Sequence, residues 1–353
     1  TIHGVHQHVQ ATFNMRGCHW QYQFLKAVWN KKHTILNVGT GSEKTLAFYI
    51  PALFAAPGQI LIVVTALNVL AAQNVAQLEA AGIPAIYIMQ DITDGKYTVV
   101  IASPEQLVKW GGGFENLFKD LTFRTRILSV AFNKGHCITQ WGSFRPEYSE
   151  ISRLQYLLPE TSFAFALAMF SLLILDEIKK SFGLATGNFV HIHWPNDRPN
   201  VHIGVQKIEH MLDSYCNLVF LVSDDWKEGD DNPCKFVAFF DNINEAVGAG
   251  TFLHQRLPLE HHNKILWFHS NITKKFKAEA FKKLRTGEIW GLCATDSFRM
   301  GVDLPNITFI VQWCTKCDLI TLWQRLGHGA QNRRLDTFGL IFVENKYLES
   351  EEK

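Results

Sequence analysis

The sequence predicts an α/β protein with two tandem domains, each built around a parallel β-sheet. Short apolar runs rich in β-branched residues alternate with helical patterns, as they do in βαβ units. A glycine-rich turn joins a strand to a helix near residue 40, and the alternation begins again after a connector at 183–200 that contains Gly and Pro. The 353 residues are enough for two domains, which we place at 1–185 and 186–353.

The elements of the first domain follow from apolar segments bounded by turn residues. Its strands are expected at 34–38, 60–65, 84–89, 98–102, 127–132 and 162–169. The segment from Thr45 to Phe54 is apolar enough for a core helix, which Pro51 should bend or end. The run from Ser162 to Leu175 is too short to cross a bilayer and should be a buried strand that enters a helix. No membrane segment is therefore expected.

The second domain repeats the alternation without a phosphate loop of its own. Its strands are expected at 201–206, 235–240, 264–269, 289–294, 307–312 and 338–343. A basic helix is expected between the third and fourth of these strands, with cations at Lys274, Lys275, Lys277, Lys282, Lys283 and Arg285. Such a helix either contacts phosphates or presents an ordinary solvated face.

The composition of the chain excludes few classes of function. The net charge of +1 gives no global basic field, so any contact with nucleic acid must come from local patches. Seven cysteines, an odd number in a large chain, indicate reduced thiols and an intracellular location. Thr1 in place of an initial Met hints at a fragment. His3, His6, His8 and His19 could bind a metal, but a frayed polar terminus is the expectation.

The segment Gly39-Thr40-Gly41-Ser42-Glu43-Lys44-Thr45 follows an expected strand and opens a helix. This order is typical of a phosphate-binding loop, whose backbone N–H groups surround a phosphate at a helix N-terminus. Lys44 would contact the phosphates and Thr45 would hold Mg²⁺. Glu43 stands where the pattern requires glycine, and its carboxylate would lie beside a triphosphate. We expect weakened nucleotide binding; the alternative is a chance glycine turn.

Further motifs occur in a fixed order along the chain. They are Trp20-Gln21, Val63 to Gln73, Ser103-Pro104-Glu105, His136 to Tyr148, Arg198-Pro199-Asn200, Phe236 to Asn242, Trp267 to Ser270, Ala294 to Asp303 and Gln324 to Gln331. With these motifs the chain resembles the RecQ-like branch of the superfamily 2 helicases, from about Phe13 to Glu344. The resemblance implies two RecA-like domains with ATP in the cleft between them, Mg²⁺ as cofactor, and 3'-5' DNA unwinding driven by ATP hydrolysis.

The resemblance also assigns roles to individual residues. Gln21 resembles the glutamine that reads adenine, and Asp303 joins Gly39 to Thr45 in the nucleotide-binding set. The segment from His136 onward resembles the end of the DEAH box and the aromatic-rich loop that follows it. In RecQ enzymes this loop links single-strand binding to ATP hydrolysis. The implied nucleic-acid contacts are Ser103, Gln140, Trp141, Phe144 and Arg145.

The aromatic loop departs from the family pattern in its spacing. Only Ser143 stands between the glycine and the phenylalanine, where the family has two residues. Trp141 and Phe144 therefore either stack on bases or pack on their own domain.

The departures from the family also fall where catalysis would occur. At the DEAH position the chain has Asn133 and Lys134 before the retained His136. An amide thus replaces the aspartate that holds Mg²⁺, and an ammonium replaces the glutamate that activates water. The Ser-Ala-Thr motif is replaced by Ala166-Leu167-Ala168, which lacks both hydroxyls. Asn133 is therefore a poor Mg²⁺ ligand, and hydrolysis should be slow or lost.

The last motif has lost its expected arginines. His328 and Gln331 stand where the family has arginines that act on the phosphates, whereas Gln324 and Arg325 remain. Arg333 or Arg334 could reach the nucleotide if the turn is shifted, and the alternative is that both are ordinary surface arginines. The catalytic set implied by the resemblance is degenerate at Asn133, Lys134, His328 and Gln331.

Three functional hypotheses follow from the sequence. The first is an active helicase, which the family implies and the site residues contradict. The second is a non-hydrolysing pseudo-helicase that binds nucleic acid or a protein, and the third is a decayed copy without activity. The expected partner is single-stranded or partly duplex DNA, and the expected location is the nucleus, by analogy with the family.

Overall fold

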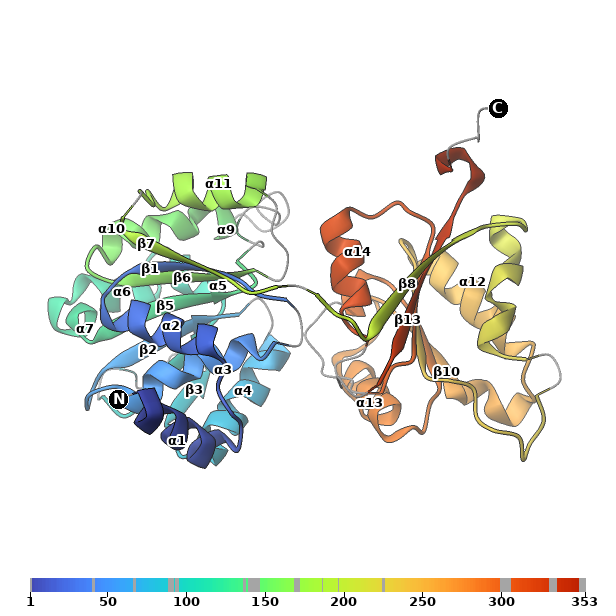
Figure 1. Ribbon diagram of the computed structural model, residues 1–353, viewed down its shortest axis with the longest axis horizontal. Coiled ribbons are helices and arrows are strands. Elements are labelled where there is room, and N and C mark those ends of the chain that lie inside the picture. Colours follow the sequence, from blue (N-terminus) through green and yellow to red (C-terminus); the bar gives the residue numbers. More distant parts are fainter. Residues whose placement is uncertain are drawn as a thin grey trace. The chain divides into compact units, whose positions relative to one another are not determined.

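A computed structural model describes residues 2–39, 42–65, 68–87, 92, 95–135, 138, 147–167, 172–185, 187–195, 197–223, 226–298, 306–329 and 335–348. The chain divides into two compact units, Thr1–Asn196 and Asp197–Lys353. Each unit is an α/β layer structure with helices on both faces of its sheet (Figure 1). Within the described residues no helix has the length and apolar character needed to cross a membrane.

The first unit contains a parallel sheet of seven strands in the order β3-β4-β2-β5-β6-β1-β7. The strands are β1 (His33–Asn37), β2 (Ile60–Val64), β3 (Ala85–Tyr87), β4 (Val99–Ala102), β5 (Ile127–Asn133), β6 (Ser162–Leu167) and β7 (Phe189–His193). The helices are α1 (Ile2–Phe13), α2 (His19–Trp29), α3 (Lys44–Tyr49), α4 (Asn68–Ala80), α5 (Pro104–Val108), α6 (Gly113–Lys119), α7 (Leu121–Thr125), α9 (Glu147–Glu150), α10 (Leu154–Leu157) and α11 (Leu172–Ser181).

The central strands of the first unit are buried on both faces because helices cover each side, whereas the edge strand β7 is partly exposed. Side chains that alternate along β1, β2 and β6, such as Leu36, Val63 and Ala164, pack against α2, α3 and α4. On the opposite face Phe132 and Phe165 stack at 5.3 Å, and Phe182 after α11 meets Phe165 at 4.6 Å. The core therefore lies in two layers on either side of the sheet.

The second unit contains a parallel sheet of six strands in the order β10-β11-β9-β12-β13-β8. The strands are β8 (Val201–Lys207), β9 (Phe236–Phe239), β10 (Ile265–Phe268), β11 (Gly291–Ala294), β12 (Phe309–Trp313) and β13 (Thr337–Val343). The helices are α12 (Ile243–His254), α13 (Lys274–Thr286) and α14 (Leu319–Leu326). Along β9, Phe236 and Ala238 belong to the core on the α12 side, whereas Val237 and Phe239 pack with α13 and α14.

Each strand expected from the sequence is present, and the expected helix after the phosphate loop is confirmed with its break. It begins as α3 and continues as a 3₁₀ turn over Ile50–Phe54, with Pro51 at the start of that turn. The expected basic helix is α13, whose N-terminus is capped by Thr273.

The expectation of a frayed N-terminus is wrong. Residues 2–13 form α1, and Val9 is buried in a cluster with Tyr22, Leu25 and Leu46. The ring of His6 also stacks on Tyr22 at 4.2 Å. Apolar burial of one helix face holds this segment even though its composition is polar.

The expectation of a plain connector at 183–200 is also wrong, because it contains β7. This strand pairs in parallel with β1 and forms the edge of the sheet. The division between the units accordingly lies after Asn196, whereas the sequence placed it after residue 185. The pairing of His33 with Phe189 through Asn37 with His193 ties this segment to the first unit.

A glycine in β11 gives a stability prediction. A Cβ at Gly291 would overlap the buried ring of Phe236, whereas a Cβ at Gly204 would only touch the end of the Leu340 side chain at 3.3 Å. Gly291→Ala should lower the free energy of unfolding by about 1–3 kcal/mol, because overpacking forces the core to shift. Gly204→Ala, the matched strand control, should cost clearly less. Chemical denaturation measures both, and equal effects would contradict this packing.

Candidate nucleotide site and a buried arginine network

The first candidate site lies at the carboxyl edge of the first sheet. β6 lies between β5 and β1, and the pairs Asn133 with Ala166 and Asn37 with Leu167 bring their last residues together. The pairing continues beyond the strands, where Gly135 N donates to Ala166 O at 2.7 Å. The loops after β1 and β5 therefore begin side by side. In open parallel sheets, this edge is where ligands bind.

Glu43 adopts the left-handed backbone conformation that the phosphate-loop pattern normally assigns to glycine. Its φ is 53° and its ψ is 44°, directly before α3. A residue other than glycine is strained in this conformation, because its Cβ crowds the carbonyl oxygen. The carbonyl of Glu43 nevertheless accepts from Leu46 N at 3.1 Å and opens the helix. The turn has kept its backbone shape while gaining an exposed carboxylate.

Lys44 is folded back onto the loop that precedes it. Its Nζ donates to Val38 O at 2.9 Å and to Gly39 O at 2.7 Å. Each carbonyl occupies one of the three N–H donors of the ammonium. A phosphate at this edge would have to compete with these carbonyls for the ammonium group.

Gln21 connects α2 to the same loop. Its side chain is 1% exposed. Its Oε1 accepts from Cys18 N at 2.7 Å, and its Nε2 donates to Glu43 O at 3.0 Å. The first bond caps α2, and the second holds the residue in the left-handed turn. The amide thus fixes the position of the loop relative to α2.

The turn after β5 carries no carboxylate over residues 133–135. Asn133 is the last residue of β5, and Lys134 has a positive φ of 68°. Gly135 lies against the sheet, since a Cβ there would be 3.2 Å from Cβ of Phe165. Asn133, Lys134 and Thr45 are all half-buried. The side chains offered to a cation are therefore an amide and a hydroxyl, whereas Mg²⁺ sites in proteins are built on one or two carboxylates.

Some expected site residues have other roles or are not described. Ser103 is buried and caps α5, where its hydroxyl accepts from Gln106 N at 3.4 Å. Ser42 is half-buried before Glu43. The expected site residues outside the described ones are Thr40, Gly41, His136, Gln140, Trp141, Phe144, Arg145, Ala168, Asp303, Gln331, Arg333 and Arg334.

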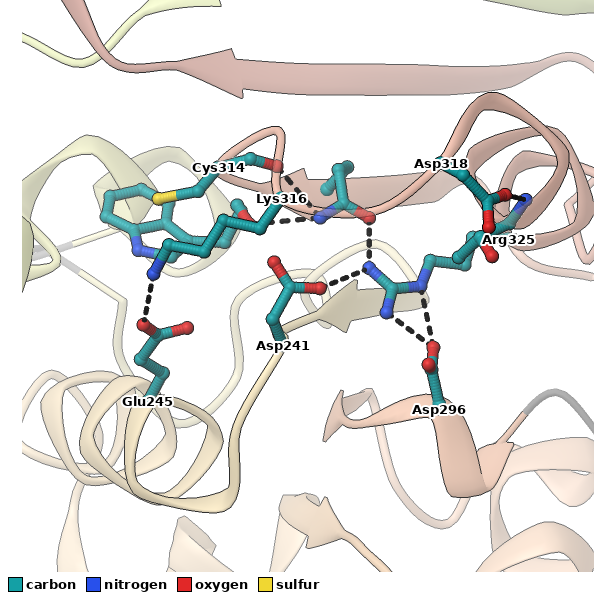
Figure 2. A network of polar contacts seen from close by, with 10 residues as sticks. Asp241, Glu245, Asp296, Cys314, Lys316, Asp318 and Arg325 are labelled. Atoms are coloured by element: carbon teal, nitrogen blue, oxygen red, sulfur yellow. Dashed lines mark hydrogen bonds and ion pairs between the residues drawn. The ribbon is translucent and has the colours of Figure 1, made fainter. Parts of the chain in front are cut away.

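Arg325, one of the two residues retained in the last motif, is the centre of a buried network in the second unit (Figure 2). Its side chain is 1% exposed. Its Nη1 donates to Asp241 Oδ1 at 3.1 Å and also to Gln312 Oε1, and its Nε and Nη2 both donate to Asp296 Oδ1. Gln312, itself buried, donates from Nε2 to the carbonyls of Trp313 and Cys314. One guanidinium thus joins α14 to the segments after β9 and β11 and to β12 itself.

Burial and the charge of Arg325 act on Asp241 in opposite directions. Burial raises the pKa of Asp241 above its ordinary value, although the nearby Arg325 charge acts in the opposite direction. A buried ion pair whose desolvation outweighs its attraction adds little net stability, but removing one partner leaves an uncompensated charge. The Lys316–Glu245 pair at 3.1 Å is more exposed than the Arg325–Asp241 pair.

His328 and Gln324 flank Arg325 in different surroundings. His328 is buried, with its ring 6.0 Å from that of Phe239 and 5.4 Å from that of Phe298. Gln324 is half-buried on α14. His328 therefore packs against aromatic side chains of its own unit.

Sequence reasoning missed Asp241, Asp296 and Gln312 as partners of Arg325. The available signal was an arginine among the apolar positions of a short helix, because a buried arginine requires acidic or amide partners. The sequence motifs contained Asp241 and Asp296 but not Gln312, and their spacing did not show that these residues meet.

Comparison with known proteins supports the fold. Residues 18–171 match the family model of the DEAD/DEAH box helicases, and residues 217–331 match that of the helicase conserved C-terminal domain. The ATP-dependent DNA helicase RecQ of Haemophilus influenzae is 20% identical over 333 residues, which cover 88% of this chain and 49% of the relative. RecQ of Bacillus subtilis is 24% identical over 337 residues, covering 88% and 51%. The chain thus spans about half the length of these relatives.

Solved structures agree with this similarity. The DUF1998 helicase MrfA bound to DNA and AMPPNP matches with a TM-score of 0.75 at 14% identity, covering 96% of this chain and 50% of that one. Dbp5 of S. cerevisiae bound to RNA and ADP BeF3 matches with a TM-score of 0.68 at 16% identity, covering 96% and 86%. These likenesses concern the fold: both units are RecA-like, as the sequence predicted.

The buried network predicts that removing the charge of Arg325 lowers stability far more than removing the charge of Lys316. Arg325→Met should lower the free energy of unfolding by about 3–5 kcal/mol, because Asp241, which is largely buried, loses its counter-charge. Lys316→Met, the control from the same view (Figure 2), should cost no more than about 1 kcal/mol because its ion pair is partly exposed. Urea denaturation measures both, and a cost below that of the control would contradict the structural role of Arg325.

The stability of the Arg325→Met variant should depend on pH through the carboxyl group of Asp241. Without the guanidinium, the pKa of this buried carboxyl should rise further above its unfolded value. A group whose folded pKa is raised favours the folded state below its unfolded pKa and loses that contribution as pH rises. The stability deficit of the variant relative to the parent should therefore be smaller at pH 5 than at pH 7.5. A deficit that grows on acidification would exclude Asp241 as its source.

Proposed function

The chain belongs to the superfamily 2 helicases and carries a RecQ-like core, and we propose that this core binds nucleic acid while nucleotide hydrolysis is weak or lost. The observation that carries the proposal is Glu43, which holds a left-handed turn where the phosphate-loop pattern has glycine. We propose the first unit, Thr1–Asn196, as the ATP-binding domain and the second unit, Asp197–Lys353, as the helicase C-terminal domain. Curated relatives at 20–24% identity are ATP-dependent DNA helicases.

Nucleotide binding at Gly39 to Thr45 is expected to be weak. The carboxylate of Glu43 would repel the phosphates, and Lys44 would have to leave the Val38 and Gly39 carbonyls to reach them. Gln21 would contact the adenine only if part of its hydrogen bonding to Cys18 and Glu43 were rearranged. The left-handed turn at Glu43 supports residual binding, but the side chains of the loop favour low affinity.

The chain lacks several side chains that the family uses for ATP hydrolysis. The residues present do not fit Mg²⁺, since Thr45 and Asn133 offer only neutral oxygens. Lys134 cannot act as the general base that the family glutamate provides, a loss typically worth ~10²–10⁴ in rate. His328 and Gln331 replace arginines that can contribute ~10³–10⁵. These factors are not multiplied, because residues of one catalytic unit act together.

Lys134 suggests that a nucleotide could bind without a metal. Its ammonium and that of Lys44 would supply positive charge to the phosphates where Mg²⁺ normally does so. Calorimetry in EDTA should then detect ATP binding. Binding that is undetectable at millimolar ATP, or that Mg²⁺ alone restores, would exclude this mode.

Nucleic-acid binding depends on other residues and can persist without hydrolysis. The structures of MrfA and Dbp5 contain DNA and RNA respectively. In this chain we propose single-stranded or partly duplex DNA, contacted by Trp141, Phe144, Arg145 and the exposed cations of α13. Lys277 is less available, because its Nζ donates to Ser270 O at 3.3 Å and lies 5.6 Å from the Phe268 ring centre. A nuclear location is proposed by family analogy.

Two alternatives rest on the same residues. A pseudo-helicase would use the retained fold as a binding module for nucleic acid or protein, and a decayed copy would have no activity. The hydrogen-bonded geometry at Gln21 and Glu43 favours a maintained scaffold. Among close relatives, a binding module should keep Glu43, Asn133 and Lys134, whereas a decayed copy should vary there.

Glu43→Gly should increase the affinity for ATP by roughly tenfold, which corresponds to about 1.4 kcal/mol. The substitution removes the repelling carboxylate and lets the backbone approach the phosphate. Lys31→Gly is the matched control, because Lys31 also has a left-handed backbone, with φ of 52°, but lies at the end of α2. Glu43→Gly and Lys31→Gly should change the free energy of unfolding by similar amounts. Only Glu43→Gly should change the ATP affinity measured by calorimetry. An equal response of both variants, or none, would contradict the role of Glu43.

Single-stranded DNA binding should depend on the exposed cations of α13. We expect sequence-independent, micromolar or weaker binding that falls steeply with salt. Lys275→Glu with Lys282→Glu should weaken it and reduce the slope of log K against log salt by about 0.7 for each lost contact. Lys207→Glu, an exposed lysine on β8, is the control. Fluorescence anisotropy that shows no binding at low salt would exclude this proposal.

A further inference from the structure

Two segments of the second unit, remote from the motifs described above, bring three metal-ligating side chains together. Glu228 lies in the turn that follows Trp226, and Glu260 and His261 lie in a 3₁₀ helix over Leu259–Lys264. One ligand atom from each of Glu228, Glu260 and His261 lies within 4.8 Å of the other two. Two ligands of one tetrahedral Zn²⁺ ion lie about 3.4 Å apart. Both glutamates are exposed, so their side chains can adjust to that spacing.

Local hydrogen bonds fix the backbone that presents these side chains. Trp226 Nε1 donates to Asp231 O at 3.0 Å, and Lys227 N donates to Asp230 Oδ2 at 2.8 Å, so the turn that carries Glu228 is closed on itself. His261 N donates to Pro258 O at 2.9 Å and forms the start of the 3₁₀ helix. The two segments are therefore shaped independently of any ligand.

Two tryptophans hold the imidazole of His261 in place. Trp226 meets its ring edge-on at 4.9 Å, and Trp290 stacks on it at 5.8 Å. The two indoles also contact each other at 5.1 Å. A ring packed between aromatic side chains has few alternative rotamers, as a metal-binding imidazole requires.

His261 is unusual in its hydrogen bonding. Both ring nitrogens are buried, and within the described residues neither has a hydrogen-bond partner. A neutral imidazole must place one donor and one acceptor, and a buried group left unsatisfied costs about 1–3 kcal/mol. Such a group calls for an explanation, for which a bound ion is one of the standard candidates. This observation is independent of the closeness of the two glutamates.

We propose that Glu228, Glu260 and His261 form a binding site for a divalent first-row transition metal ion, with Zn²⁺ the best fit. One imidazole nitrogen and two carboxylate oxygens are ligands that Zn²⁺ accepts, and the exposed side of the site leaves a fourth position for water. The ion would satisfy one nitrogen of His261 and relieve the repulsion between the two carboxylates. The proposal does not depend on nucleotide or nucleic-acid binding.

The test is a titration of the full chain with Co²⁺ and Zn²⁺, using calorimetry and the visible absorption of Co²⁺. One equivalent should bind without the thiolate absorption that a cysteine site would produce. Glu228→Gln and Glu260→Gln should each weaken binding by roughly tenfold or more. Glu209→Gln is the matched control, because Glu209 and His210 form an exposed Glu-His pair in the same unit; it should leave the affinity unchanged.

His261→Phe separates the metal site from a structural role. It keeps the aromatic packing against Trp226 and Trp290, so the metal-free variant should be at least as stable as the parent, while stabilisation by Zn²⁺ should disappear. A clear loss of metal-free stability would show that the ring is already hydrogen-bonded, and would overturn the proposal. Equal Co²⁺ affinity in Glu228→Gln, Glu260→Gln and Glu209→Gln would also overturn it.

Discussion

Parallel pairing of β6 with β5 and with β1 is the constraint on which the nucleotide edge of the first unit depends. The register places Ala166 beside Asn133 and Leu167 beside Asn37, and the hydrogen bond from Gly135 to Ala166 extends this pairing into the loop. The turn at Glu43 and the turn at Lys134 therefore share one edge, whatever side chains they carry. The fold can keep the site's outline after the chemistry has changed, since the outline is set by backbone pairing and the chemistry by a few side chains.

The second unit depends in a similar way on Arg325. Its guanidinium joins α14 to Asp241 and Asp296, which follow β9 and β11 respectively (Figure 2). Arg325, which the sequence placed in the catalytic set, thus holds three segments together at one edge of the sheet. His328 is likewise packed against Phe239 and Phe298. Both observations agree with a core that keeps its architecture while its phosphate chemistry is reduced.

The regular part of the fold could be predicted because parallel strands buried on both faces are continuous apolar runs. β7 was missed because it is an edge strand with exposed polar positions, and α1 because little more than Val9 enters the core from its polar sequence. At the site, the motif located Glu43 but could not give its left-handed conformation or its bond from Gln21. The partners of Arg325 could not be predicted either, since Asp241 is 84 residues away and a spacing alone carries no contact.

Steady-state ATP hydrolysis with and without single-stranded DNA, at low salt, shows whether the chain has lost its nucleotide chemistry. The unmodified chain is measured beside a revertant that carries Glu43→Gly, Asn133→Asp, Lys134→Glu, His328→Arg and Gln331→Arg. We expect no DNA-stimulated turnover in the unmodified chain and measurable turnover in the revertant, as for an intact scaffold with altered chemistry. DNA-stimulated hydrolysis by the unmodified chain would contradict this expectation.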